Sequence, residues 1–148
     1  MTTKYHRFPS TWRVGPNDPL KKKYPLQLIT THFRCRAHSQ SEYVPCLKEL
    51  EPQAMLINSV DASARKIKDG DQVMVFNDRG KLTIIAARVT ERIMPGAVDI
   101  PQGAWYDPDE GGVDRGGCCR ALTKDEHSPG GALCSNTCLV EVQKVLGS

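Results

Sequence analysis

The side chains best suited to chemistry lie in three short segments, of which the first runs from Thr31 to Gln40 and reads THFRCRAHSQ. An arginine fork can pair with two phosphate oxygens while hydroxyl groups donate to the remaining ones. The segment could therefore bind a diphosphate. A polar surface loop with no ligand accounts for the same composition. The residues with suitable side chains are Thr31, His32, Arg34, Arg36, His38, Ser39 and Gln40.

The second segment places Asn58 three residues before Asp61, between a short apolar stretch and a helix-sized one. A carboxylate can accept two parallel hydrogen bonds from N1 and N2 of guanine, and an amide beside it can meet a carbonyl or a ribose. Asp61 could instead cap the helix that we expect at residues 62–67, because a carboxylate accepts the free amides of a first turn. A capping oxygen is less free to bind a base, so the two roles compete.

The third segment, residues 102–117, reads QGAWYDPDEGGVDRGG. Glycine lets a backbone approach a ligand closely, and Trp105 could lay its ring beside a planar group two residues after Gly103. Trp105 could equally anchor the loop in the core. The acids of this segment lack the regular spacing of an EF-hand loop, so we do not expect a calcium site.

None of these segments contains a set of residues typical of catalysis or of a metal site. The histidines lack a nucleophile at the spacing of a catalytic pair, and the six cysteines form no C-x2-C pair. A net charge of +3 is too small to indicate nucleic acid. No apolar run reaches the length of a membrane span, and the first residues do not form a secretory signal. We expect a binding domain with no catalytic and no metal-ligating residues.

The elements that must position these segments are mostly strands. Alternating apolar residues predict a β-hairpin from 72–77 and 81–89, joined by Asp78, Arg79 and Gly80. Further strands are expected at 25–31, at 55–57 before Asn58, at 97–100 and at 138–145. We predict a mainly β fold, a closed β-barrel with one or two short helices and long loops. Residues 1–24 are rich in proline and read as an extended linker from an upstream domain, and residues 25–148 as the barrel domain.

Several motifs, in order along nearly the whole chain, resemble the C-terminal molybdopterin guanine dinucleotide-binding domain of the dimethyl sulfoxide reductase family. Within that family they are most similar to the catalytic A subunits of the anaerobic dimethyl sulfoxide reductases. The motifs are YPLQLITTHFRCRAHSQ, LINSVDASARKIKDGDQVMVFNDRG, VTERIMPGAV, QGAWYDPD and SNTCLVEVQK.

The resemblance implies a double-psi β-barrel that helps to hold two copies of molybdopterin guanine dinucleotide, which carry molybdenum or tungsten. By position it assigns Asn58 and Asp61 to the guanosine end, and Thr31, His32, Arg36, His38 and Ser39 to the pterin and diphosphate. It assigns Gly103 and Trp105 to the cofactor cleft and Asn136 to a position near a pterin.

The resemblance also implies that the full enzyme reduces an S- or N-oxide by oxygen-atom transfer, whereas the 148-residue chain alone is inactive. The implied partners are upstream domains of the same polypeptide, an iron–sulfur electron-transfer subunit and a membrane-anchor subunit, with no nucleic acid and no direct membrane contact. The full enzyme would lie in the periplasm or on the outer face of the cytoplasmic membrane. The chain expressed alone, lacking a signal, would be cytoplasmic.

Two rival functions remain open at the level of sequence. A stand-alone β-barrel could bind protein or nucleic acid through the lysines at 21–23 together with Arg34 and Arg36. A small enzyme on a similar barrel, such as a self-processing decarboxylase, would need a Gly-Ser pair in a mid-chain hairpin, and this chain has none.

Overall fold

The computed structural model describes residues 19–79, 82–124, 127, 131–133 and 135–145. The described chain is mainly β, as predicted. In chain order its elements are the 3₁₀ helix η2 (Pro19–Lys22), β1 (Leu26–Ile29), α1 (Pro45–Leu50), β2 (Ala54–Ile57), α2 (Ser59–Ala64), β3 (Gln72–Phe76), β4 (Leu82–Val89), β5 (Ala97–Asp99), β6 (Val113–Asp114), the 3₁₀ helix η3 (Cys119–Ala121) and β7 (Thr137–Lys144).

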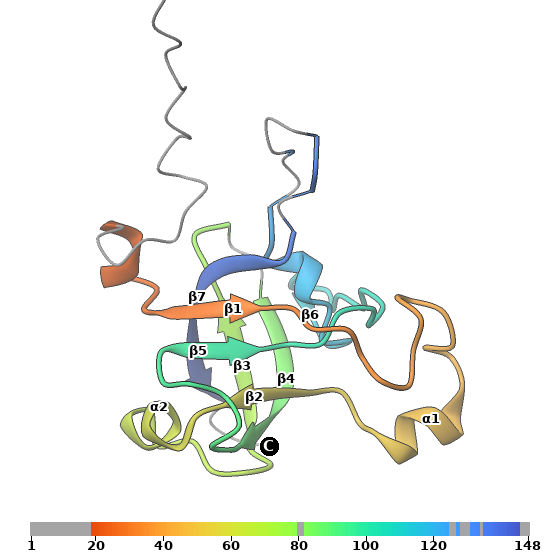
Figure 1. Cartoon of the computed structure of the whole chain (residues 1–148), viewed down its shortest axis with the longest axis horizontal. Coiled ribbons are helices and arrows are strands. Elements are labelled where there is room, and N and C mark those ends of the chain that lie inside the picture. The colour runs from red at the N-terminus through yellow and green to blue at the C-terminus, as the bar shows by residue number, and fades with distance from the viewer. Residues whose placement is uncertain (1–18, 80–81, 125–126, 128–130, 134, 146–148) are drawn as a thin grey trace, which may run out of the picture.

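Six of these strands close into a barrel (Figure 1). The order around the ring is β2-β5-β1-β7-β3-β4, and β4 pairs with β2 to complete it, while β6 adds to β4. The pairs β1–β5 and β2–β4 are parallel, and the other pairs of the ring are antiparallel. The predicted closed barrel and the β3–β4 hairpin are confirmed.

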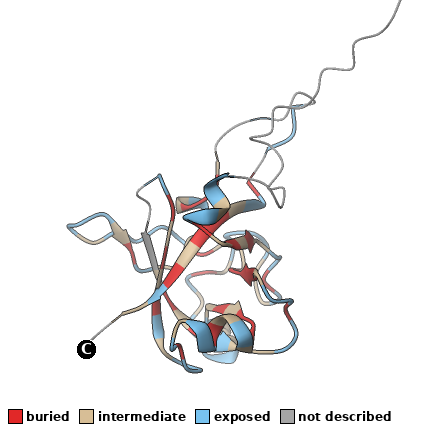
Figure 2. Cartoon of the chain, turned by 90° about the vertical axis from the view of Figure 1, so that its left-hand side faces the viewer, coloured by how far each residue is buried: buried red, intermediate tan, exposed pale blue. Residues whose placement is uncertain are grey.

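Alternation along the strands builds the core, because successive residues of a strand face opposite sides of the sheet. Val73 and Val75 of β3 are fully buried, whereas Met74 and Phe76 between and after them are half-buried. Leu28 of β1 and Val98 of β5 are paired in register and are both fully buried. Figure 2 shows buried residues concentrated along the strands.

The helix after β2 begins earlier than the sequence predicted, and its cap is Asn58 rather than Asp61. Asn58 has the extended backbone that an N-cap requires, and its Oδ1 accepts a hydrogen bond from Val60 N at 2.9 Å. Asp61 lies in the first turn of α2, where its Oδ2 accepts from Gly96 N at 2.7 Å. The prediction that Asp61 caps a helix over 62–67 is therefore wrong.

Four elements were not predicted: η2, which lies within the expected linker, α1, which follows the Thr31–Gln40 segment, and β6 and η3, which lie within residues expected to form a loop. The predicted linker falls mainly on residues 1–18, outside the described residues. Its last residue, Tyr24, is buried and packs edge-on against Phe76, with the ring centroids 6.4 Å apart. Among the described residues, no helix has the length and apolar character to cross a bilayer.

Strand direction separates the predicted site residues between two ends of the barrel. Since β1 and β5 are parallel, Thr31 and Gln102 follow them at one end, here named the loop end, where α1 also lies (Figure 1). Strand β2 runs antiparallel to β5, so Asn58 and Asp61 lie at the opposite end, near Gly96. We name this the helix end, after α2.

The position of two leucines relative to the core predicts that their substitutions differ strongly in the free energy of unfolding. Leu28→Ala removes a fully buried side chain from the centre of the barrel and should lower the free energy of unfolding by about 2–5 kcal/mol. Leu50→Ala, at a side chain that is 69% exposed, should change it by less than about 0.5 kcal/mol. Urea unfolding of both variants measures the difference, and equal losses would contradict this account of the core.

Candidate functional site

At the loop end, Thr31 is held by the carboxylate of Asp99. Thr31 N donates to Asp99 Oδ1 at 3.1 Å, and Thr31 Oγ1 donates to Asp99 Oδ2 at 2.8 Å. Asp99 is 4% exposed. Burial raises the pKa of the Asp99 carboxyl, and the two hydrogen bonds from Thr31 oppose this rise. Gln102 N donates to Thr31 O at 2.9 Å, so the backbone of Thr31 is fixed from both strands.

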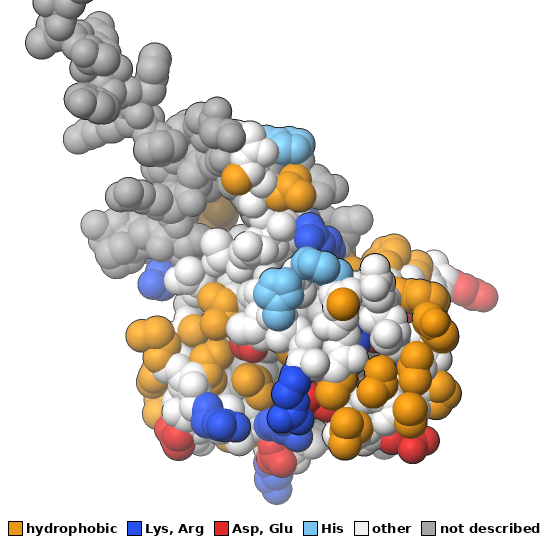
Figure 3. Space-filling view, turned by 45° about the vertical axis from the view of Figure 1, so that its right-hand side comes forward, with side chains coloured by type: hydrophobic (Ala, Val, Ile, Leu, Met, Phe, Trp, Pro, Cys, Tyr) orange, Lys and Arg blue, Asp and Glu red, His pale blue; other side chains and the backbone are white. Residues whose placement is uncertain are grey.

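Two exposed histidines lie next to Thr31. The ring centroids of His32 and His38 are 5.1 Å apart and the rings meet edge to face. Gln102 Nε2 lies 3.0 Å from Nδ1 of His32, on the same surface. Figure 3 shows imidazole side chains lying at this surface, with apolar side chains beside them. Imidazole groups can donate to an anion or, when neutral, also accept from an N–H group.

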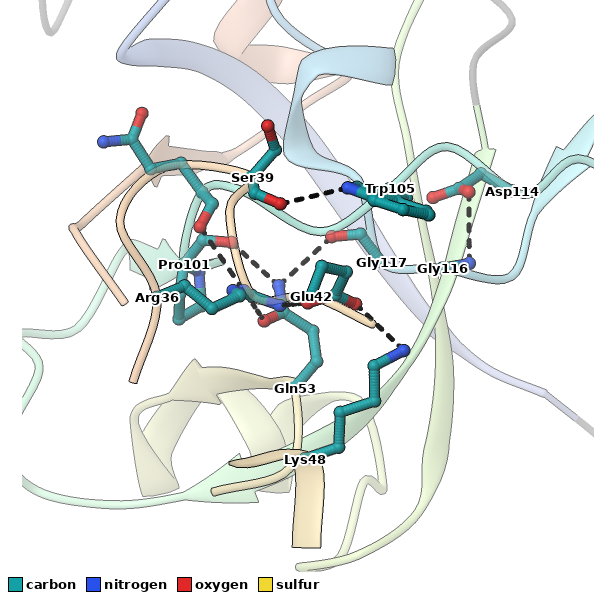
Figure 4. A network of polar contacts seen from close by, with 11 residues as sticks. Arg36, Ser39, Glu42, Lys48, Gln53, Pro101, Trp105, Asp114, Gly116 and Gly117 are labelled. Atoms are coloured by element: carbon teal, nitrogen blue, oxygen red, sulfur yellow. Dashed lines mark hydrogen bonds and ion pairs between the residues drawn. The ribbon is translucent and has the colours of Figure 1, made fainter. Parts of the chain in front are cut away.

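The Thr31–Gln40 and 102–117 segments touch each other through their backbones. A Cβ atom on Gly103 would lie 1.8 Å from His38 O, and Gly103 has a φ of +102°. Trp105 Nε1 donates to Ser39 O at 3.1 Å (Figure 4). Trp105 is 54% exposed, so its ring is available at the surface and does not anchor the loop in the core.

Arg36 is buried beneath this surface and its guanidinium is used inside the protein (Figure 4). Its side chain is 4% exposed. Nη1 donates to Glu42 Oε2, Nη2 donates to Gln53 Oε1 at 2.6 Å and to the carbonyl of Gln102, and the guanidinium lies over the ring of Phe33 at 4.0 Å. These contacts support a structural role for Arg36. Its contact with a diphosphate stays a prediction.

Gln53 and Asp114 extend this buried framework to the third segment. Gln53 Nε2 donates to the carbonyls of Pro101 and Gly117, at 2.8 and 3.2 Å. Asp114 is fully buried and accepts hydrogen bonds from three backbone amides, those of Asp107, Gly116 and Cys118. The framework leaves a pocket of about 360 Å³ that is lined in part by Phe33, Lys48 and Arg115.

The remaining predicted residues divide between the two ends. Asn136 is exposed at the loop end, where its carbonyl accepts from Thr30 N at 3.2 Å. At the helix end Asn58 is 2% exposed, and its Nδ2 donates to Ile93 O at 2.8 Å in addition to the cap. Asp61 Oδ1 lies 3.9 Å from Nη1 of Arg65. Hydrogen bonds within the protein thus engage Asn58, and the reading of guanine by Asn58 and Asp61 stays a prediction.

Sequence reasoning missed four residues that organise the loop end: Glu42, Gln53, Asp99 and Gln102. One signal was available for Asp99, since an ionisable residue stands in the otherwise apolar strand AVDI. Buried ionisable residues normally have a partner. Glu42 and Gln53 carry no comparable signal, because only the folded loop brings them to Arg36.

Comparison with known proteins identifies one family over most of the chain. The family model described as molydopterin dinucleotide binding domain matches residues 26–138. The dimethyl sulfoxide reductase DmsA of Escherichia coli (strain K12) is 50% identical over 129 residues, covering 86% of this chain. The dimethyl sulfoxide/trimethylamine N-oxide reductase of Cereibacter sphaeroides is 40% identical over 136 residues, covering 85%.

A solved structure supports the fold. Acetylene hydratase from Pelobacter acetylenicus superposes with a TM-score of 0.71 at 18% identity, covering 86% of this chain and 19% of that one. The chain spans only 16% of the length of each of the two reductases.

The close approach of the two loops predicts that Gly103 does not tolerate a side chain. Gly103→Ala adds a Cβ that clashes with His38 O and also strains a positive φ. Gly112 also has a positive φ, but a Cβ atom there would meet open space. Gly112→Ala therefore measures the backbone strain alone, without a clash, and should cost about 1–2 kcal/mol. We expect Gly103→Ala to cost clearly more in urea unfolding and to shift the amide resonances of residues 38–40. Equal costs would contradict the contact.

The buried ion pair of Arg36 and Glu42 predicts a larger loss of stability than the exposed pair of Arg34 and Glu51 when the glutamate is replaced. Glu42→Gln removes the negative partner of a buried guanidinium and should destabilise the chain by about 3–5 kcal/mol. Glu51→Gln removes the partner of Arg34, whose side chain is 79% exposed, and should cost no more than about 1 kcal/mol. Thermal unfolding of both variants checks this. A loss of stability in Glu42→Gln no larger than that in Glu51→Gln would contradict a structural role for Arg36.

Proposed function

Because the chain belongs to the molydopterin dinucleotide binding domain family of the dimethyl sulfoxide reductase type enzymes, we propose that it holds molybdopterin guanine dinucleotide within a full-length oxidoreductase. The full enzyme then reduces an S- or N-oxide. The observation that carries the proposal is the gathering, at one end of the barrel, of exposed polar and aromatic groups from loops far apart in the sequence. These residues are Thr31, His32, His38, Ser39, Trp105 and Asn136.

The chemistry of these residues fits the cofactor. The imidazoles of His32 and His38 and the hydroxyl of Ser39 can donate to a diphosphate, and the exposed face of Trp105 suits a planar ring. The contact between Gly103 and His38 brings the two loops together so that these groups lie on one surface. When bound, the cofactor supplies the two-electron redox chemistry of oxygen-atom transfer. The chain's own residues bind and orient it, and the isolated chain is inactive.

The helix end takes a different part of the same ligand in this proposal. Gly96, which contacts Asp61, and Gln102, which contacts Thr31, are six residues apart in sequence, or about 20 Å along an extended strand. A dinucleotide is long enough to reach from one end to the other. Asp61 and Asn58 would then meet the guanosine, with Arg36 supporting the diphosphate loop from beneath. A double-psi crossing of the strands belongs to the same proposal.

The partners follow from the length of the relatives. Since this chain corresponds to 16% of each of these reductases, we expect other domains of the same polypeptide to enclose the remainder of the ligand and to contribute the metal ligand. An iron–sulfur electron-transfer subunit and a membrane-anchor subunit complete the proposed assembly, which lies in the periplasm or on the outer face of the cytoplasmic membrane.

Cofactor retention in the full-length enzyme tests the loop end. Changing both His32 and His38 to alanine removes two donors to the diphosphate and should reduce the molybdenum and pterin content of the purified enzyme about tenfold or more. His127→Ala, at another exposed histidine, is the matched control and should retain both. Metal analysis and pterin fluorescence after oxidation give the contents. Full retention in the double variant would refute the proposed site.

Asp61→Asn tests the helix end separately. If the carboxylate accepts the two N–H groups of guanine, the amide loses one of these bonds and the enzyme should retain less cofactor. Normal molybdenum occupancy in the variant would refute the guanine-reading role and leave Asp61 with its contacts to Gly96 N and Arg65.

A further inference from the structure

Thr31 has no hydrogen-bond donor left for a ligand. Both of its donors, the backbone N–H and the hydroxyl, go to the two oxygens of Asp99. Its carbonyl accepts from Gln102 N. The residue is nevertheless exposed. What its side chain can offer a ligand is therefore the lone pairs of its hydroxyl oxygen.

Because the partner of the Thr31 hydroxyl is a carboxylate, the hydroxyl can only accept a further hydrogen bond. An ionised carboxylate only accepts hydrogen bonds, so the single hydroxyl proton of Thr31 is committed to Asp99. Toward any further partner this oxygen can therefore only accept a hydrogen bond. A phosphate oxygen is also an acceptor, and it would be repelled by the negative charge of Asp99 behind the hydroxyl. Thr31 is therefore poorly matched to a phosphate and well matched to an N–H group.

We propose that Asp99 is a positioning residue, which holds the Thr31 hydroxyl as a hydrogen-bond acceptor for an amino group of the bound ligand. This inference rests on the proposed function and refines it. The ligand chemistry is the 2-amino-4-oxopyrimidine edge, which the pterin and the guanine of the dinucleotide share. The diphosphate is then left to His32, His38 and Ser39, the donors of the same surface.

Pairs of small molecules that differ only at the amino group test whether Thr31 accepts a hydrogen bond from it. Their binding is measured by NMR with the 148-residue chain labelled with 15N. Guanosine monophosphate is compared with inosine monophosphate, which lacks the amino group, and 6-hydroxymethylpterin with 6-hydroxymethyllumazine, which has a carbonyl in its place. We expect the amino-bearing member of one pair to bind about threefold to tenfold more tightly, with a shift of the Thr31 amide. The pair that discriminates identifies the guanine or the pterin as the source.

Substitutions then assign the effect to Asp99. In Asp99→Asn the side-chain amide can donate to the Thr31 oxygen, which frees the hydroxyl proton to point outward, so the preference for the amino group should vanish or reverse. Thr31→Ser should keep the preference and Thr31→Val should lose it. Asp71→Asn, at a carboxylate next to the start of β3 that accepts hydrogen bonds from Lys68 N and Lys144 Nζ, should leave the ratio unchanged.

Several results would overturn this inference. They are equal affinities within both pairs, a preference that survives Asp99→Asn, a uniform weakening of all four compounds in that variant, or no binding of any of them by the wild-type chain. Its failure is separable from that of the proposed function. If the His32 and His38 double variant loses cofactor while both pairs bind equally, only the role of Asp99 is refuted.

Discussion

The parallel pairing of β1 with β5 is the constraint on which the rest of this domain depends. Parallel strands end at the same edge, so the loops that follow β1 and β5 must emerge side by side although they are about seventy residues apart. The contact of Gly103 with His38 and the bonds of Thr31 to Asp99 both lie at this edge. The opposite direction of β2 sends Asn58 to the far end.

The buried ion pair and the exposed polar groups have different roles at the loop end. The ionised residues Arg36 and Glu42 are buried and bind each other and backbone groups, while imidazoles, a hydroxyl and an indole face outward. Taking ions out of water is costly unless they are paired, and once paired they fix the loops in one arrangement. The loops that carry the exposed groups are therefore held in one arrangement, which is what the proposed binding of a ligand at this surface requires.

The sequence predicted what depends on local periodicity. Alternating apolar residues predicted the two strands of the β3–β4 hairpin, and the connection between them followed from its turn residues. It offered only Asp61 as a cap, whereas the cap is Asn58, because both residue types cap helices and only the end of β2 selects Asn58. It assigned Arg36 to a ligand because the partners that bury its guanidinium, Glu42 and Gln53, meet it only in three dimensions. The fold was thus largely predictable, whereas the role of each charged residue at the site was not.

Closure of the six-strand ring has a consequence for how this domain associates with other chains. A sheet with an open edge offers unpaired N–H and C=O groups on which a foreign strand can add. Here β4 returns to pair with β2, and the strand added outside the ring, β6, has only two residues. Addition of a foreign strand and edge-to-edge aggregation are therefore disfavoured for the described part of this barrel, which leaves side chains and loops as its main surfaces for association.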